Sequence, residues 1–158
     1  TAESKKLIDN YVISKPSDFA KAIEDIPGKF DVVMSSHNLE HTLDRNKVLV
    51  NMLSKVEKNG LFYLSFPCME STKFPSRQGT LNYFDDETHH DIPPSYDDII
   101  KVIREHGFKI TYSTRRHRPM LLFFIGLILE PISNFKKKVL RGTWEYYGFE
   151  SIIHAKKI

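Results

Sequence analysis

Two short stretches of this 158-residue chain contain the side chains best suited to chemistry. Ser35 to His41 has the sequence Ser-Ser-His-Asn-Leu-Glu-His and directly follows the apolar run 30–34. Asp85 to Asp91 has the sequence Asp-Asp-Glu-Thr-His-His-Asp and is the densest polar cluster of the chain. A neutral imidazole of His89 or His90 can take a proton from a hydroxyl group near neutral pH. The alternative is a solvated loop in which a buried His89 only fixes the shape of the loop.

The residues from His37 to His41 also have the spacing His-x-x-Glu-His, which is the pattern of inverted zinc peptidases. That chemistry requires both histidines on one helix and a further carboxylate ligand nearby. Because only Ser36 separates His37 from the predicted strand, His37 lies in the turn. We therefore predict no metal site. Glu40 and His41 are instead expected to begin the next helix, where the helix dipole favours a carboxylate.

The elements that position these residues follow from apolar runs and turn residues. Residues 30–35 form a continuous apolar strand, typical of a parallel strand that is covered on both faces. From Asp44 onward apolar residues recur with helical spacing, and Asn59-Gly60 then precedes a second apolar strand at 61–66. This is a βαβ unit. Open α/β sheets bind ligands at the carboxyl ends of such strands, where the polar residues of the first stretch lie.

The remaining elements complete a predicted α/β pattern within one domain over 1–158. The segment 68–91 has no regular period, and a loop of this length in a compact domain is usually functional. A helical insert is predicted at about 115–140. The other expected elements are a strand at 10–14, a helix at 19–26, a helix at 96–105, a strand from 108 to 112 and a last strand at 147–155.

The bulk composition limits the class of protein. The chain is 41% apolar and 27% charged, which is ordinary for a globular protein, and its net charge of +3 is too small to indicate nucleic-acid binding. Cys68 is the single cysteine, so no internal disulfide can form, and we expect a buried structural thiol. The polar residues Thr1–Lys6 show no secretory signal. These features predict a cytoplasmic protein.

The longest apolar run lies at 120–129, about half of the ~20 residues that a membrane-spanning helix requires. Arginines precede it at 115, 116 and 118, and lysines follow it at 136–138. We expect a buried helical insert that packs over the site. The alternative is peripheral contact with a membrane through residues 119–138.

Several motifs occur along the chain in a recognisable order. Phe-Asp-x-Val at 30–33 precedes a small polar pair and then Leu-Glu-His at 39–41. Ser-x-Pro ends the next strand at 65–67. Thr-His at 88–89 precedes a helix that is followed by Gly-Phe at 107–108. This series resembles the class I S-adenosylmethionine-dependent methyltransferases. The resemblance implies a three-layer Rossmann-like sheet, mostly parallel, with an antiparallel C-terminal strand.

The chain departs from that family in its cofactor half. The family fold has seven strands, and five are predicted here, so the first two strands are missing. The Gly-x-Gly turn that approaches the cofactor is missing too, since none of the 7 glycines has that spacing. The chain is then either the C-terminal part of a longer methyltransferase or a degenerate form that binds the cofactor poorly or not at all.

The resemblance implies S-adenosyl-L-methionine as the cofactor. Ser36, His37 and Asn38 would line it at the end of the strand 30–35. Ser17 and Asp18 would face the adenine, with capping of the following helix as the alternative role.

The resemblance also implies an acceptor side. Glu40, His41 and Thr88 would lie there, with His89 or His90 as the catalytic base; for Glu40 and His41 a purely orienting role is the alternative. The expected reaction is methyl transfer to a small-molecule, sugar or lipid-linked acceptor. The competing hypothesis is a non-catalytic methyltransferase-like module that binds a partner or forms a homo-oligomer.

Overall fold

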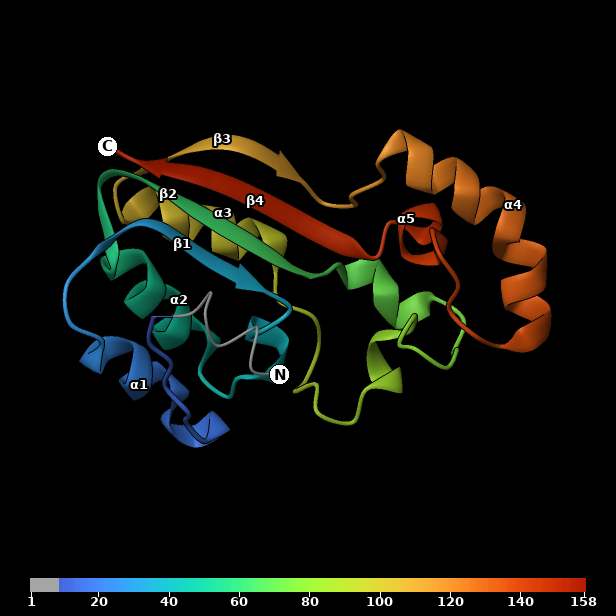
Figure 1. The fold of residues 1–158 in the computed structure, drawn as a ribbon, viewed down its shortest axis with the longest axis horizontal. Coiled ribbons are helices and arrows are strands. Elements are labelled where there is room, and N and C mark those ends of the chain that lie inside the picture. The colour runs from blue at the N-terminus through green and yellow to red at the C-terminus, as the bar shows by residue number, and fades with distance from the viewer. Residues whose placement is uncertain (1–8) are drawn as a thin grey trace.

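The computed structural model describes residues 9–158 and has an α/β fold (Figure 1). The polar stretch Thr1–Lys6 lies outside the described residues. Four strands form one mixed sheet in the order β1-β2-β4-β3. Their bounds are Phe30–Ser36 for β1, Val56–Pro67 for β2, Phe108–Thr114 for β3 and Glu150–Lys157 for β4.

The strand directions follow the predicted scheme. β1 and β2 are parallel, and β4 is antiparallel to both β2 and β3. Three strands therefore run in one direction, and the C-terminal strand runs against them, as predicted. The register pairs Ser36 with Ser65, so the carboxyl ends of β1 and β2 lie side by side.

Three helices pack on one face of the sheet and form the core with it. They are α1 (Phe19–Asp25), α2 (Arg45–Ser54) and α3 (Tyr96–Glu105). The core includes Leu49 of α2 and Ile103 of α3 together with Phe62 and Ile153 of the sheet, each at most 1% exposed. Full burial of one such side chain contributes roughly 1.5–3 kcal/mol. The positions of the three helices in the chain follow from the apolar periodicity of the sequence.

The opposite face of the sheet is open among the described residues, which corrects the three-layer prediction. Val32 and Met34 of β1 are 51% and 67% exposed, and Leu61 of β2 and Tyr112 of β3 are 49% and 45% exposed. The apolar run of β1 indicated coverage on both faces. In the described chain, however, α1, α2 and α3 all join the core on the same side.

Two predicted strand positions are also corrected. Residues 10–14 are not a strand but an irregular segment, in which Val12 is 66% and Ile13 is 87% exposed. β1 is therefore an edge strand, and the described sheet has four strands rather than five. The last strand begins at Glu150 and not at 147, because the preceding aromatic residues form the short helix α5 (Thr143–Tyr147). Gly148, with a φ of 64°, ends that helix.

The segment after β2 and the insert after β3 lie beside each other at one end of the molecule (Figure 1). The first contains the short 3-10 turns η4 (Met69–Lys73) and η5 (Tyr83–Asp85), and the second contains α4 (Met120–Lys136) and α5. Trp144 donates a hydrogen bond of 2.8 Å to the Thr80 carbonyl and so connects the two. Within residues 9–158, no helix has the length and apolar character needed to span a bilayer.

Candidate functional site

The site begins where β1 and β2 end. The hydroxyls of Ser36 and Ser65 lie 3.0 Å apart, and the His37 amide donates to the Ser65 carbonyl at 3.0 Å. His37 has a φ of 48°, a left-handed conformation that is uncommon for a residue with a Cβ atom. The chain therefore turns sharply at the edge of the sheet, as predicted for a residue just past the strand.

The His37 ring lies between two carboxylates. Its Nδ1 atom is 3.0 Å from Glu40 Oε1, and its Nε2 atom is 2.5 Å from Glu150 Oε1. Burial alone lowers the pKa of His37, but the hydrogen bonds to Glu150 and Glu40 outweigh it and raise the pKa to about 9. The imidazole is thus a cation at neutral pH. Since Glu150 is 113 residues away in the chain, no local pattern could have revealed this partner.

Glu40 and His41 do not begin the long helix, contrary to the prediction. They belong to a separate 3-10 turn, η3 (Leu39–His41), and α2 starts only at Arg45 after the cap provided by Asp44. Glu40 is fully buried in this turn. Its carbonyl accepts a hydrogen bond of 2.9 Å from the His90 amide, which fastens the loop 68–95 to the turn.

The loop brings Thr88 and His89 against this turn. Thr88 Oγ1 lies 2.9 Å from His41 Nδ1, and the two imidazole rings of His41 and His89 have centroids 4.8 Å apart. His89 Nδ1 lies 2.6 Å from the carbonyl oxygen of Tyr83, and the rings of His89 and Tyr83 stack with their centroids 4.4 Å apart. The predicted acceptor-side residues therefore gather in one place. For His90 the structure shows hydrogen bonds of its backbone only.

Arg45 holds the loop in this position, which the sequence did not indicate. Its guanidinium donates to the carbonyls of Ile92 and His90 and, at 3.2 Å, to the hydroxyl of Tyr83. The same side chain donates to the Leu39 carbonyl of the turn at 3.2 Å. Arg45, the first residue of α2, thus connects the loop 68–95 with the turn η3. Only the tertiary contacts distinguish it from a surface arginine of the helix.

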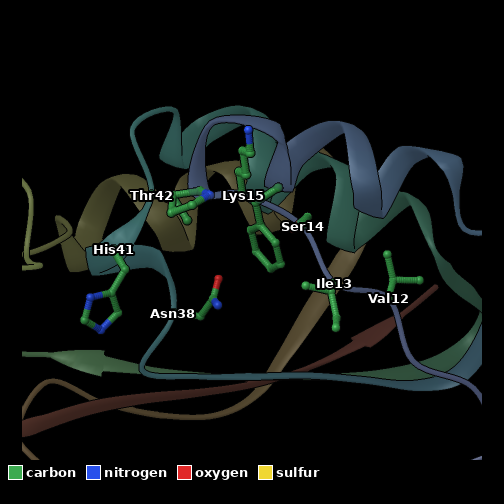
Figure 2. A pocket seen from close by; sticks show the side chains of 9 residues that line it. Val12, Ile13, Ser14, Lys15, Asn38, His41 and Thr42 are labelled. Atoms are coloured by element: carbon green, nitrogen blue, oxygen red, sulfur yellow. The ribbon is translucent and has the colours of Figure 1, made fainter.

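A cavity of about 400 Å³ lies beside the turn (Figure 2). Asn38, His41 and Thr42 line one side, and the irregular segment 12–16 lines the other together with Phe19. Sites for small ligands commonly have volumes of about 300–1,000 Å³. Of the residues predicted to bind the cofactor, only Asn38 lines this cavity.

The other predicted cofactor residues lie elsewhere. Ser36 contacts Ser65, and His37 is held by the two glutamates described above. Ser17 lies in the 3-10 turn η2 (Pro16–Asp18), and Asp18 lines a second cavity of about 1220 Å³ between the segment 9–14 and α1. Asp18 also occupies the N-cap position of α1, but its side chain makes no capping hydrogen bond.

Cys68 is the buried thiol that its position after β2 predicted. It is 1% exposed, and its Sγ atom donates to the Gly148 carbonyl at 3.3 Å. Burial raises the pKa of Cys68 to about 12, with a further contribution from the negative charge of Glu70. The thiol is therefore neutral at physiological pH and has no part in the site.

No protein-family model and no curated protein matches the chain significantly, but many solved structures resemble it. A SAM-dependent methyltransferase from Archaeoglobus fulgidus matches 99% of the chain with a TM-score of 0.52 and 22% identity. The chain has the fold of SAM-dependent methyltransferases. A S-adenosylmethionine-dependent methyltransferase from Mesorhizobium loti matches 85% of it with a TM-score of 0.55 and 12% identity.

An O-methyltransferase family protein from Burkholderia thailandensis matches 94% of the chain with a TM-score of 0.51 and 13% identity. The chain spans 73% of the Archaeoglobus protein, 67% of the Mesorhizobium protein and 35% of the Burkholderia protein. The methyltransferase fold expected from the ordered motifs is thus confirmed over most of the chain.

Proposed function

We propose that this chain forms part of a SAM-dependent methyltransferase that acts on a small-molecule, sugar or lipid-linked acceptor. The observation that supports this most strongly is the cavity at the carboxyl end of β1 within a methyltransferase fold. Methyl transfer from a sulfonium is an in-line displacement at a carbon that is already activated. The protein mainly has to position the two reactants and, for a hydroxyl or amine acceptor, remove a proton.

In this proposal Asn38 contacts S-adenosyl-L-methionine in the cavity, with Ser36 and His37 behind it. Ser17 and Asp18 lie on the adenine side. The acceptor lies toward Glu40, His41, Thr88 and His89, which gather next to that cavity.

Calorimetric titration with S-adenosylhomocysteine tests the cofactor site. We expect binding in the micromolar range, and we expect Asn38→Ala to weaken it about tenfold, which corresponds to the loss of one hydrogen bond of about 1.4 kcal/mol. Asn46→Ala is the matched control, because Asn46 is exposed on α2 and lies outside the cavity. Its affinity should equal that of the unmodified protein.

A folded protein that fails to bind S-adenosylhomocysteine would support the competing proposal, a non-catalytic module that associates with a second copy of itself. Among residues 9–158, the open sheet face and the unpaired edge of β1 favour that proposal, since exposed strand edges and apolar faces promote pairing. Analytical ultracentrifugation of the same sample would then show a dimer. Micromolar cofactor binding by a monomer would exclude it.

We further propose that α4 brings the protein to anionic membranes, which suits a lipid-linked acceptor. Leu121, Phe124, Ile128 and Phe135 lie at helical spacing and are 74%, 53%, 74% and 88% exposed. The expectation that this insert is buried is therefore wrong for this face of α4. The exposed lysines 136–138 follow the stripe directly and supply the charge that attracts acidic headgroups.

Vesicle sedimentation tests this contact. We expect the protein to sediment with phosphatidylserine-containing vesicles, to remain in solution with phosphatidylcholine vesicles, and to be released by added salt. The double variant Ile128→Glu, Phe135→Glu should lose most of the binding. Ile158→Glu is the control, since Ile158 is 76% exposed but lies at the opposite end of the molecule (Figure 1). Equal binding by both variants would refute a role for α4.

A further inference from the structure

Glu40, His41 and His89 form a compact cluster beside the cavity. One potential ligand atom from each residue lies within 4.8 Å of those of the other two. Glu40 and His41 come from the turn η3, whereas His89 comes from the loop 68–95. The three side chains are therefore placed together by the fold and not by a helix repeat.

The hydrogen bonds of His89 leave one ring nitrogen available. Its Nδ1 atom lies 2.6 Å from the Tyr83 carbonyl oxygen, which can only accept, so Nδ1 must bear the proton. In a neutral imidazole the Nε2 atom then has a free lone pair. A metal-binding histidine typically donates its other N–H to a backbone carbonyl in this way.

The same reasoning applies to His41. Thr88 Oγ1 donates its only proton to Asp86 Oδ1 at 2.6 Å, so it accepts from His41 Nδ1 at 2.9 Å. The Nε2 atom of His41 is therefore also left with a lone pair. Two imidazoles from distant parts of the chain thus each donate an Nδ1 proton to another group and keep a lone pair on Nε2. Near Nε2 of His89 lies Asp86 Oδ2, but its distance of 3.9 Å is too long for a hydrogen bond.

Glu40 provides an independent observation. The residue is 0% exposed, and its Oε1 atom is bound to His37. Among the residues that the structure describes, its Oε2 atom has no hydrogen-bond partner although it is buried. An unsatisfied buried carboxylate oxygen is costly, and native proteins seldom contain one without a ligand, water or ion.

We propose that Glu40, His41 and His89 bind a divalent transition-metal ion through Glu40 Oε2 and the two Nε2 atoms. Two imidazoles and one carboxylate suit zinc, cobalt or manganese and leave coordination positions open. The spacing His-x-x-Glu-His pairs His41 with His37 and not with His89, so the sequence predicted no metal site. His37 is held between Glu40 and Glu150. If the proposed methyl transfer holds, the oxygen of an acceptor hydroxyl can occupy an open position, where the cation would lower the pKa of that hydroxyl and favour loss of its proton to solvent water.

Direct metal binding tests the site without reference to activity. Purified protein, stripped with a chelator, is titrated with Zn²⁺ by calorimetry and with Co²⁺ by absorption spectroscopy. We expect one ion per chain and visible Co²⁺ absorption bands typical of nitrogen and oxygen ligands. His89→Ala and the isosteric Glu40→Gln should each weaken Zn²⁺ binding by at least about 10- to 100-fold, since even outer-shell changes cost that much.

His90→Ala is the matched control, because His90 is the neighbour of His89 but lies outside the cluster and contributes only backbone hydrogen bonds. It should bind Zn²⁺ like the unmodified protein. Thr88→Val should weaken Zn²⁺ binding about tenfold, since it removes the hydroxyl that accepts the hydrogen bond of His41 Nδ1. Circular dichroism verifies that each variant is folded.

Two results would overturn the metal site: no stoichiometric binding by the folded protein, or equal affinity in the Glu40→Gln, His89→Ala and His90→Ala variants. Either result would leave the cofactor titration untouched, so failure of the metal site and failure of the methyltransferase proposal can be told apart.

Discussion

Replacing Glu130 with alanine should lower the free energy of unfolding by about 3–5 kcal/mol, the loss typical when one partner of a buried ion pair is removed. The Arg77 side chain is 1% exposed and donates two hydrogen bonds to Glu130, of 2.8 Å and 2.6 Å. Tyr147 donates to the same carboxylate at 2.7 Å. Without Glu130 the guanidinium stays buried with no counter-charge. Urea unfolding followed by circular dichroism measures the difference.

Two further variants distinguish the energetic cost of an unpaired buried charge from that of the lost contacts. The double variant Arg77→Met, Glu130→Leu removes both charges and should recover much of the stability. The exposed pair Lys21 and Asp25 has side chains 72% and 61% exposed, so Lys21→Ala should cost less than about 1 kcal/mol. If Glu130→Ala were as mild as Lys21→Ala, the ion pair would not hold α4 against the loop.

The second large effect is expected from Gly126→Ala, which should destabilise the protein by about 3 kcal/mol, the upper end for overpacking. A Cβ atom at Gly126 would lie 1.9 Å from the carbonyl oxygen of Gly142, so the backbones of α4 and the start of α5 would have to separate. In an isolated helix the same change would stabilise by roughly 0.5–1 kcal/mol. The sign of the measured change is therefore decisive.

Gly28→Ala is the control for this variant. A Cβ atom there would meet nothing within 4 Å, but Gly28 has a φ of 78°. Only backbone strain should appear, of roughly 1–2 kcal/mol. A Gly126→Ala protein at least as stable as the unmodified one would contradict the close packing of α4 on α5.

Both effects concern the attachment of α4: Glu130 joins it to the loop, and Gly126 packs it against the start of α5. Arg77 belongs to the loop that also carries Thr88 and His89, and Glu130 lies on α4. The exposed stripe of α4 and the proposed metal cluster are therefore connected through one buried ion pair. Loss of that pair should be detected first as lower stability, and then as weaker vesicle and metal binding.

The sequence alone determined the elements whose signals are local. The βαβ unit from Phe30 to Pro67 was predicted because an apolar run, a helical repeat and an Asn-Gly turn each act within a few residues. The same local signals predicted the edge of the sheet at which the polar residues lie. They failed for 10–14, where β-branched residues indicated a strand that has no neighbouring strand to pair with in the described sheet.

Only the tertiary structure decided which polar residues meet. His41 and Thr88 are 47 residues apart, and His37 and Glu150 are 113 apart. Such pairs are brought together when helices and strands pack, and a side chain contains no sequence signal of its distant partner. The sequence therefore supplied the candidate residues and the edge of the sheet. The packing of the loop against η3 decided that Glu40 joins His41 and His89, while both ring nitrogens of His37 are occupied by Glu40 and Glu150.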